Sequence, residues 1–523
     1  MKYLQYRNST AIISQDGEVS YEGLYRRICE YSRLIDGAGA RGGKIAIYSD
    51  NRPEWVYALF GGWNSGSTVV PIDSMSLYDE VAYILDDCRP DAVFTSRRRL
   101  PELEQALASS ASAPRILVFE ELNILPEPDS GHNFEPLERS DDDAAMIIYT
   151  SGTTGSPKGA VVTFSNIEAS VSAVSGESSI FNLRDRVMVL LPIHHIFPLG
   201  GTILAPLYAG SCCVFSPSVG SRDLLETLQQ HGVTVIVGVP RLYNMLIREI
   251  RKKISASFGA RALFSLARSV GLPLLSKFIF ARVHRQFGGK IRFLISGGAA
   301  IEDDVVKDFK ALGFNVITGY GMTETTSLIS FTRPGAMRIG ASGHPCPEIE
   351  VRIVDGEIAV KGRHVMKGYY NRPGETSDII RDGWLYTGDL GHVDSDGFVF
   401  VTGRKKEIIV LSNGKNINPE EIESKLLDRF DAVKEVAVCQ HDGVLHAVIH
   451  PDPDKVIEII TGSAEEYFRK EVIGPYNRQA SSSKRIVKFT VVSQELPKTR
   501  IGKIRRFQLP ELIAETPFRR PEG

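Results

Sequence analysis

Eleven residues at positions 149–159, YTSGTTGSPKG, combine three glycines, five serines or threonines, one proline and one lysine. Glycine and proline disfavour both helix and strand, so this segment is predicted to be a loop. Backbone N–H groups, hydroxyls and a lysine in one loop can surround phosphate oxygens. The composition therefore indicates a site for a phosphorylated ligand.

The spacing within this loop argues against the two common phosphate motifs. A P-loop needs lysine directly after its second glycine and Ser or Thr directly after the lysine. Here Lys158 follows Pro157 and precedes Gly159, and no G-x-G-x-x-G is present in the stretch. A flexible linker would not explain a lysine placed between two β-branched runs. The loop is thus predicted to serve an ATP chemistry other than that of P-loop ATPases or kinases.

The stretch resembles the phosphate loop of the adenylate-forming superfamily, which includes acyl-CoA synthetases, peptide-synthetase adenylation domains and luciferases. Six later stretches resemble the family's further motifs in the same order, and the N-terminal region is also similar. These stretches are LPIHHIFPLGG (191–201), ISGGAAI (295–301), GYGMTETT (319–326), LYTGDLG (385–391), TGRKKEIIVLSNGKNINPEEIE (402–423) and LPKTRIGKIRR (496–506).

The resemblance implies a two-step reaction. A carboxylate attacks the α-phosphorus of ATP to give acyl-AMP and pyrophosphate, and a thiol then displaces AMP to give a thioester. A carboxylate by itself is a poor acylating agent because oxide is a very poor leaving group, whereas AMP leaves readily. The protein must align two anions and neutralise charge at phosphorus, which is mainly electrostatic work.

The family pattern also implies roles for individual residues. Lys503 is expected to neutralise the carboxylate and α-phosphate, Thr323 to donate to the α-phosphate, Glu324 to hold Mg²⁺, and His195 to orient the acid, although a structural role for His195 is almost as well supported. Asp389 and Arg404 would hold the ribose, and Tyr320 would stack on adenine. The remaining ATP or AMP contacts are expected from Thr150, Ser151, Gly152, Thr153, Thr154, Gly155, Lys158, Gly298, Ala299 and Gly321.

The second half-reaction is expected to need a change in domain orientation. Lys406 occupies the family's hinge position, and Gly414, Lys415 and Asn416 match the segment that lines the thiol tunnel. The co-substrates implied are ATP, Mg²⁺ and CoA. An acyl carrier protein remains an alternative acceptor, because the C-terminal region lacks the long acidic insertions of larger long-chain enzymes.

The acid is predicted to be a fatty acid of medium to long chain. VPRLY places Tyr243 where long-chain members carry an aromatic gate to the acyl pocket, and no aspartate for an amino-acid ammonium group can be placed. An aryl or short-chain acid remains the alternative. A non-enzymatic scaffold protein that merely kept this fold would be expected to have lost Lys503, Glu324 or Asp389, and all three are present.

These residues require an α/β scaffold of at least two domains, since 523 residues exceed what one core usually serves. Near-continuous apolar runs separated by amphipathic segments predict a large N-terminal domain, 1–403, of mainly parallel sheets flanked by helices. Short strands with Asp-Gly turns predict a β-rich, barrel-like subdomain at about 335–403. A small, mobile α+β domain is expected at 404–523.

The bulk composition restricts the partners and the location. The net charge of −2 gives no indication of nucleic-acid binding. The six cysteines form no C-x-x-C pair, and no apolar stretch resembles a signal peptide or membrane span, so a cytoplasmic protein is expected. The oligomeric state cannot be inferred.

One segment, 248–292, contains eleven Lys or Arg and a single acidic residue. Two interpretations stay open for this segment. It is either a peripheral contact with anionic lipid on the cytoplasmic membrane face, or a solvated helical hairpin whose apolar stripe packs on its own domain.

Overall fold

Alternating apolar strands and amphipathic helices produce two mainly parallel sheets in the larger part of the chain, as the sequence predicts. The computed structural model describes residues 9–122, 134–150, 157–176, 180–218, 220–270, 273–411, 416–453, 455, 464–498 and 504–515. Unit 1 comprises Met1–Arg352, Ala359–Thr387 and Val393–Phe400, and unit 2 comprises Ile353–Ile358, Gly388–His392 and Val401–Gly523. The predicted division at 403/404 thus has its counterpart between Phe400 and Val401, but two short pieces of the preceding segment belong to unit 2.

The first sheet of unit 1 has seven strands, with five parallel strands and an antiparallel edge. Its strands in spatial order are β18 (Gly368–Tyr369), β8 (Lys158–Thr163), β7 (Ala144–Thr150), β4 (Thr68–Ile72), β3 (Lys44–Tyr48), β5 (Ala92–Thr95) and β6 (Arg115–Val118). The residues of β3 and β5 are almost all fully buried, which is the pattern expected of a sheet covered on both faces. The antiparallel strands β8 and β18 bring segments distant in the sequence side by side.

The second sheet of unit 1 has nine strands, of which six form a parallel centre. Its spatial order is β15 (His344–Pro345), β14 (Ser330–Phe331), β13 (Val316–Tyr320), β12 (Phe293–Ser296), β11 (Val235–Gly238), β9 (Arg186–Val189), β10 (Cys212–Phe215), β1 (Thr10–Ser14) and β2 (Gly17–Ser20). The carboxyl ends of β12 and β13 lead directly into the ISGGAAI and GYGMTETT stretches. Both motifs therefore begin at the same edge of this sheet.

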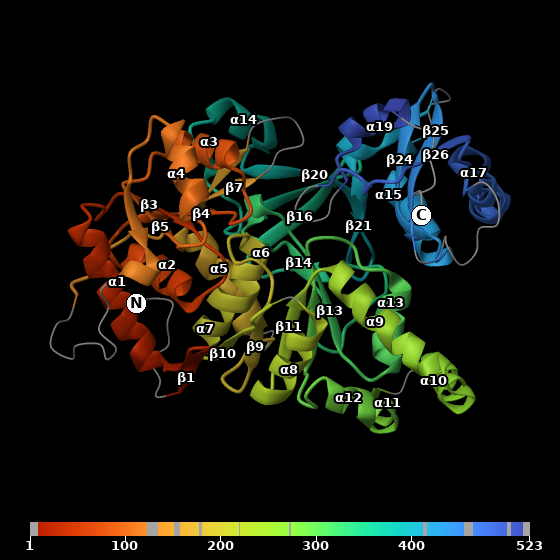
Figure 1. Ribbon diagram of the computed structural model, residues 1–523, viewed down its shortest axis with the longest axis horizontal. Coiled ribbons are helices and arrows are strands. Elements are labelled where there is room, and N and C mark those ends of the chain that lie inside the picture. Colours follow the sequence, from red (N-terminus) through yellow and green to blue (C-terminus); the bar gives the residue numbers. More distant parts are fainter. Residues whose placement is uncertain are drawn as a thin grey trace. The chain divides into compact units, whose positions relative to one another are not determined.

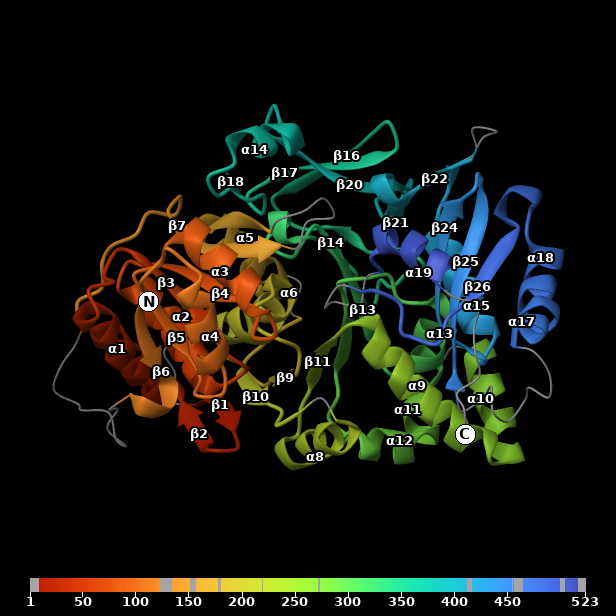
Figure 2. The same ribbon diagram turned by 45° about the horizontal axis from the view of Figure 1, so that its top comes forward.

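Helices cover the two sheets, and α5 (Phe164–Ser175) lies between them in both views (Figures 1 and 2). Helix α5 begins with a capping box in which Thr163 and Asn166 satisfy each other's backbone N–H groups. The other helices of unit 1 are α1 (Tyr21–Gly37), α2 (Pro53–Asn64), α3 (Tyr78–Cys88), α4 (Leu100–Ala108), α6 (Ile196–Pro198), α7 (Ala205–Ala209), α8 (Ser221–His231), α9 (Pro240–Ser255), α10 (Phe258–Val270), α11 (Pro273–Ile279), α12 (Ala281–Gln286), α13 (Asp303–Ala311) and α14 (Pro373–Ile379).

The segment that follows β15 forms a five-stranded sheet. Its strands are β16 (Ile349–Val354), β17 (Glu357–Gly362), β20 (Trp384–Val393), β19 (Ile380–Arg381) and β21 (Val399–Arg404), of which β21 pairs with β20. The predicted Asp-Gly turn joins β16 to β17, with φ of 51° at Asp355 and 80° at Gly356. Positive φ at both positions suits the right-handed twist of a tight hairpin.

The rest of unit 2 forms a small α+β fold with its own core. Its strands are β22 (Ile409–Val410), β23 (Asn416–Ile417), β24 (Val433–His441), β25 (Val444–Pro451) and β26 (Lys488–Val491), and its helices are α15 (Pro419–Arg429), α17 (Ala464–Tyr467), α18 (Gly474–Gln479) and α19 (Leu509–Glu515). Ile422, Leu426 and Phe468 are completely buried in that core. Among the residues described in either unit, no helix is both long and apolar enough to cross a bilayer.

Candidate active site

The predicted phosphate loop joins the two strands of a hairpin, β7 and β8. Thr150 and Lys158 are the last paired residues of these strands, and Tyr149 pairs with Gly159. A Cβ at Gly159 would lie 2.6 Å from Ile147, so the close packing of the hairpin requires glycine here. The predicted residues Ser151, Gly152, Thr153, Thr154 and Gly155 lie outside the described part of the chain.

Lys158 is held by groups that lie outside the sequence motifs. Its ammonium forms an ion pair with Glu375 of α14 and lies 5.5 Å from the ring centroid of Tyr369. Tyr369 reaches this position because β18 pairs with β8, placing it opposite Ala160. In the sequence these partners belong to the polar segment GYYNRPGE (368–375), which lies outside every motif stretch.

Glu324 lies on the 3₁₀ turn η3 (Thr323–Thr325) and is 8% exposed. The hydroxyl of Tyr369 donates to Glu324 Oε1 over 2.6 Å. Burial, reinforced by the charge of Glu324, raises the pKa of Tyr369, so the phenol stays protonated and remains a donor. The turn is also tied through its backbone, since Met366 N–H donates to the Glu324 carbonyl over 2.8 Å.

The predicted adenine-site residues flank the same turn. Tyr320 is half-buried at the end of β13, where it pairs with Ser330 of β14. A Cβ at the following Gly321 would lie 2.1 Å from the Ser327 carbonyl oxygen. The tight turn that carries Thr323 and Glu324 therefore requires glycine at position 321.

The second glycine turn lies after β12. Gly298 has φ of +81°, a conformation that favours glycine, and both Gly298 and Ala299 are exposed. Their backbone is thus accessible to a ligand, as the prediction requires. The neighbouring Gly297 approaches the Phe197 ring so closely that a Cβ would lie 2.7 Å from it.

His195 occupies the N-cap position of α6, and the Asp73 carboxylate lies beside the neighbouring His194. His194 is 6% exposed in its side chain, lies 3.4 Å from Asp73 Oδ1, and its ring centroid is 4.1 Å from that of His195. The three residues each place a possible ligand atom within 4.8 Å of the others. Asp73 directly follows β4, far in the sequence from the LPIHHIFPLGG stretch, so the motif spacing gives no indication of this contact.

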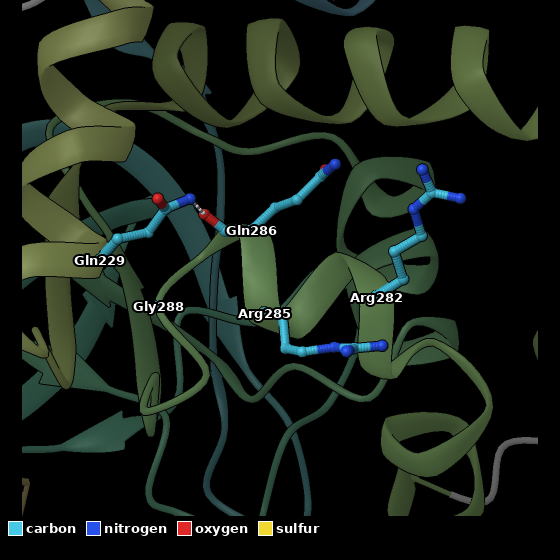
Figure 3. Close-up of a pocket in the computed structure, with 5 residues that line it drawn as sticks. All are labelled: Gln229, Arg282, Arg285, Gln286 and Gly288. Carbon is cyan, nitrogen blue, oxygen red and sulfur yellow. Dashed lines mark hydrogen bonds between the residues drawn. The ribbon is translucent and has the colours of Figure 1, made fainter.

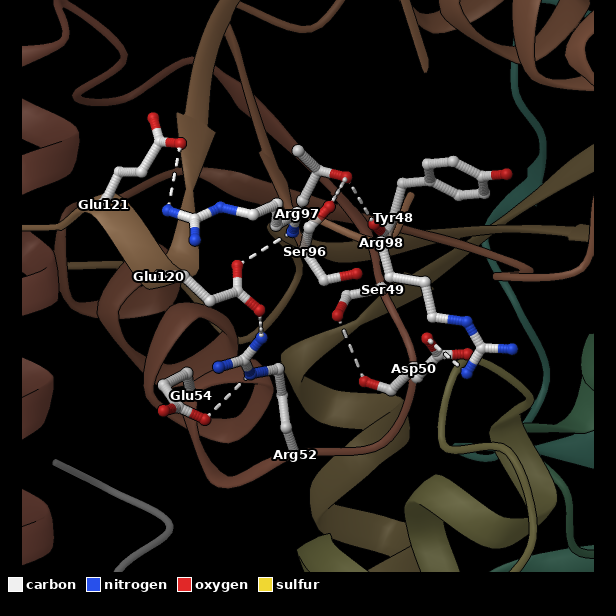
Figure 4. Close-up of polar contacts among 11 residues, drawn as sticks. Tyr48, Ser49, Asp50, Arg52, Glu54, Ser96, Arg97, Arg98, Glu120 and Glu121 are labelled. Atoms are coloured by element: carbon white, nitrogen blue, oxygen red, sulfur yellow. Dashed lines mark hydrogen bonds and ion pairs between the residues drawn. The ribbon is translucent and has the colours of Figure 1, made fainter. Parts of the chain in front are cut away.

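Asn51 fixes the backbone that leads into the histidine pair. Its Nδ2 donates to the Leu191 carbonyl over 2.8 Å, and its Oδ1 accepts the Ile193 N–H over 3.0 Å. Figure 4 shows the polar contacts around its neighbours Asp50 and Arg52, with Arg98 reaching Asp50 and Arg52 reaching Glu120. This loop is therefore cross-linked to residues that follow neighbouring strands, and Asn51 ties it to the backbone just ahead of the histidine pair.

Contacts join these stretches into one continuous wall within unit 1. Phe197 of α6 packs on Gly297. Gly200 of the π-helix η2 (Leu199–Leu204) lies against Ser327, since a Cβ at Gly200 would be 3.3 Å from the Ser327 hydroxyl oxygen. The turn just before Ser327 holds Glu324, which Tyr369 links to the hairpin of Lys158. Four motif stretches from distant parts of the sequence thus meet along one side of the two sheets.

The predicted ribose-binding residues lie together in unit 2. Arg404 Nε is 3.0 Å from Asp389 Oδ1, and the Asp389 side chain is 5% exposed. Glu357 supports the same turn by accepting the Gly388 N–H over 2.9 Å and pairing with Lys405 over 2.8 Å. Glu357 was not expected from the motifs, since it belongs to the β17 strand pattern.

Other predicted residues of unit 2 are only partly described. Lys406 is exposed on the 3₁₀ turn η4 (Lys405–Glu407), and Asn416 is the first residue of β23. Gly414, Lys415 and Lys503 lie outside the described residues. The segments flanking Lys503 are anchored, because Lys498 pairs with Glu435 and Arg506 with Glu423.

Tyr243, the predicted acyl gate, is a completely buried residue on α9. Its hydroxyl donates to the carbonyls of Ile236 and Ile295 over 3.0 and 2.7 Å. Burial raises its pKa, and the ring packs edge-on against Phe309. A gate at this position would therefore have to break two hydrogen bonds to strands β11 and β12.

Comparison with known proteins agrees with this architecture. Residues 3–370 match the model of the AMP-binding enzyme family, and residues 406–515 match that of the AMP-binding enzyme C-terminal domain. A long-chain-fatty-acid–CoA ligase, FadD15 of Mycobacterium bovis, is 29% identical over 80% of this chain and 75% of its own length. The indoleacetate–CoA ligase of Aromatoleum aromaticum is 26% identical over 97% of this chain and 96% of its own.

A solved structure shows the same fold. ATP-bound MatB from Rhodopseudomonas palustris superposes with a TM-score of 0.80 at 25% identity, covering 98% of this chain and 97% of MatB. The chain belongs to the AMP-binding enzyme family, and the resemblance to adenylate-forming enzymes is confirmed. The α/β fold with a large N-terminal part and a small C-terminal part is confirmed as well.

Proposed function

We propose that this enzyme activates a medium- to long-chain fatty acid as acyl-AMP and transfers the acyl group to CoA. The observation that carries the proposal is the continuous wall on which Lys158, Glu324, His195 and the Gly298 turn meet. This wall offers a cation for phosphate, a carboxylate for a metal and accessible backbone for a nucleotide. The alternatives are transfer to an acyl carrier protein and the use of an aryl or short-chain acid.

The residues of the wall take distinct parts in the first half-reaction. Lys158 and the 151–155 loop would hold the β- and γ-phosphates, and Thr323 would donate to the α-phosphate. His195, supported by Asp73 through His194, would orient the carboxylate for in-line attack. The carboxylate oxygen bonds to the α-phosphorus while the bond to pyrophosphate breaks, and Lys503 would neutralise the developing charge.

The donor set at Glu324 fits Mg²⁺. A single buried carboxylate beside the phosphate site supplies a hard oxygen ligand, and Mg²⁺ typically combines one or two carboxylates with phosphate oxygens and water. When bound, Mg²⁺ would neutralise phosphate charge. Asp389 and Arg404 would hold the ribose, and Lys406 would act as the hinge before CoA enters past Gly414, Lys415 and Asn416.

The reaction class is tested by ATP–pyrophosphate exchange with a panel of fatty, aryl and short-chain acids. Medium- and long-chain fatty acids should stimulate exchange most, and a stronger response to aryl acids would favour the alternative. If no acid stimulates exchange, the proposed function is wrong. Adding CoA or acyl carrier protein afterwards identifies the acceptor. Lys503→Ala should abolish exchange but spare thioester formation from supplied acyl-AMP.

A membrane contact of the segment 248–292 is part of the same proposal, because fatty acids partition into bilayers. One face of α9–α12 packs in the core through Ile250, Ile254, Ala267 and Phe280, as one of the two interpretations of the sequence requires. The other face leaves apolar side chains exposed. Phe258 is 80% exposed, Phe278 is 82% and Leu266 is 61%.

Positive charge lies in the same segment, and the Arg261 guanidinium is 5.7 Å from the ring centroid of Phe258. Arg251 and Arg268 pair with Asp308, but Arg261, Lys277, Arg282 and Arg285 have no ion pair with any residue that the structure describes. Arg282 and Arg285 of α12 line a recess of about 780 Å³ together with Gln229, Gln286 and Gly288. Figure 3 shows these lining residues. A segment that combines exposed aromatic residues with unpaired cations suits an anionic bilayer better than a neutral one.

Co-sedimentation with vesicles tests this contact. Binding to vesicles that contain phosphatidylglycerol should exceed binding to pure phosphatidylcholine and should weaken as salt rises. Phe258→Ser with Phe278→Ser, and Arg282→Glu with Arg285→Glu, should each reduce it. Arg222→Glu on α8, where Arg222 is also exposed, is the control. Vesicle binding that does not depend on lipid charge would contradict the proposal. If the enzyme instead binds acidic acyl carrier protein through this segment, the carrier protein would be favoured over CoA as acceptor.

A further inference from the structure

Lys158, the lysine expected to contact phosphate, forms an ion pair with the carboxylate of Glu375 in this structure. Lys158 pairs with Glu375, and its ammonium also faces the Tyr369 ring at 5.5 Å. The Lys158 side chain is 26% exposed and that of Glu375 is 38%. Both groups are therefore accessible to a ligand from solvent. A triphosphate that approaches Lys158 meets the negative charge of Glu375 at the same point.

Glu375 has a second cation within reach. Arg372, one turn earlier in the same segment, places its Nε 3.7 Å from Glu375 Oε1. Arg372 is held in place by Asp87 at 3.0 Å and by the Tyr83 hydroxyl at 3.1 Å. Glu375 can therefore leave Lys158 without losing every ionic partner, because its other carboxylate oxygen already lies within ion-pair distance of Arg372.

We propose that Glu375 sets the affinity of the enzyme for the triphosphate of ATP, by holding Lys158 before the nucleotide binds and moving to Arg372 when phosphate takes its place. The inference rests on the proposed function, because it assigns Lys158 to the β- and γ-phosphates. No covalent step is involved. The binding of ATP exchanges one partner of Lys158 for another, and the carboxylate that leaves would otherwise repel the phosphates.

The size of the effect follows from the exposure of the pair. Ion pairs between partly exposed side chains contribute about 0.2–1 kcal/mol. Removing the competing carboxylate should thus tighten ATP binding by a factor of about 1.4 to 5. AMP lacks the two phosphates that Lys158 is expected to hold, so its affinity should not change. This contrast separates an effect on the triphosphate from a general change in the site.

The experiment measures the dissociation constants of ATP, pyrophosphate and AMP for the full-length enzyme by calorimetry without acid substrate. Glu375→Gln should bind ATP and pyrophosphate more tightly than the wild type and AMP equally well. Arg372→Gln, which removes the alternative partner, should weaken ATP binding. Combining Lys158→Ala with Glu375→Gln should abolish the gain. Glu226→Gln removes a solvent-exposed ion pair with Arg222 on α8 and should change none of the three constants.

Three results would overturn the inference. These are unchanged or weaker ATP binding by Glu375→Gln, an equal gain for AMP, and a gain that persists without Lys158. Each of them is compatible with acid-dependent pyrophosphate exchange by the wild type, so the proposed function would stand. Failure of the proposed function would instead appear as a wild-type enzyme that binds ATP but shows no exchange with any acid.

Discussion

Tyr369 and Glu324 are joined by a hydrogen bond of 2.6 Å from the phenol to the carboxylate, across 45 residues of sequence. The ring of the same tyrosine faces Lys158. One side chain thus touches both the carboxylate expected to hold Mg²⁺ and the lysine expected to hold phosphate. Its strand, β18, is short and depends on β8 for its place in the sheet.

Tyr369→Phe should raise the Mg²⁺ concentration needed for half-maximal pyrophosphate exchange several-fold. The substitution keeps the ring that faces Lys158 and removes only the hydroxyl that fixes Glu324, whose loss typically costs about 0.5–1.5 kcal/mol. Binding of Mg²⁺-free ATP should stay unchanged. An unaltered Mg²⁺ dependence would show that Tyr369 does not position the carboxylate.

Asp73→Asn should lower kcat/KM for the acid by about tenfold while the KM for ATP stays near the wild-type value. The carboxylate lies 3.4 Å from His194, and a neutral amide would hold the His194–His195 pair less firmly in one orientation. Steady-state kinetics with each substrate varied in turn provides the measurement. Asp79→Asn, at the exposed start of α3, is the control. Equal losses for both substrates would argue for a purely structural role.

Gly321→Ala should destabilise unit 1 by about 1–3 kcal/mol and impair nucleotide binding, because its Cβ would lie 2.1 Å from the Ser327 carbonyl oxygen. The matched control is Gly319→Ala, whose Cβ would lie 3.6 Å from its nearest neighbour, an ordinary contact. Thermal unfolding and ATP binding measure the two effects. Equal behaviour of the two variants would contradict the proposed tight turn.

The enzyme should lose stability as the pH falls from about 6.5 to 4. Burial lowers the pKa of His364 to about 4. Between these values the unfolded chain binds a proton that the folded state does not, so the free energy of unfolding decreases with falling pH. The loss from this one group is on the order of 3 kcal/mol at about 1.36 kcal/mol per pKa unit.

His364→Phe should flatten this part of the pH profile, as measured by urea unfolding at several pH values. The exposed His392→Phe is the control, because its ring is accessible to water. A wild-type slope in the His364 variant would assign the acid sensitivity to other groups. His446, whose pKa is also lowered to about 4 by burial, is then the next residue to substitute.

The sequence by itself determined the local features on which the site depends. The hairpin flanks of the phosphate loop, the strands that lead into ISGGAAI and GYGMTETT, and the Asp-Gly turn all follow from short-range patterns. Family motifs also named Asp389 and Arg404, which the structure places 3.0 Å apart. The reason is that backbone propensities and motif spacing act within a few residues.

Only the tertiary structure decided which side chains meet. The pairing of β18 with β8 brings Tyr369 and Glu375 to Lys158, and the loop after β4 brings Asp73 to His194. It also decided that Tyr243 is a core residue and that Phe258 and Phe278 are exposed. Such outcomes depend on strand order and on packing between distant segments, and a one-dimensional pattern carries no information about either.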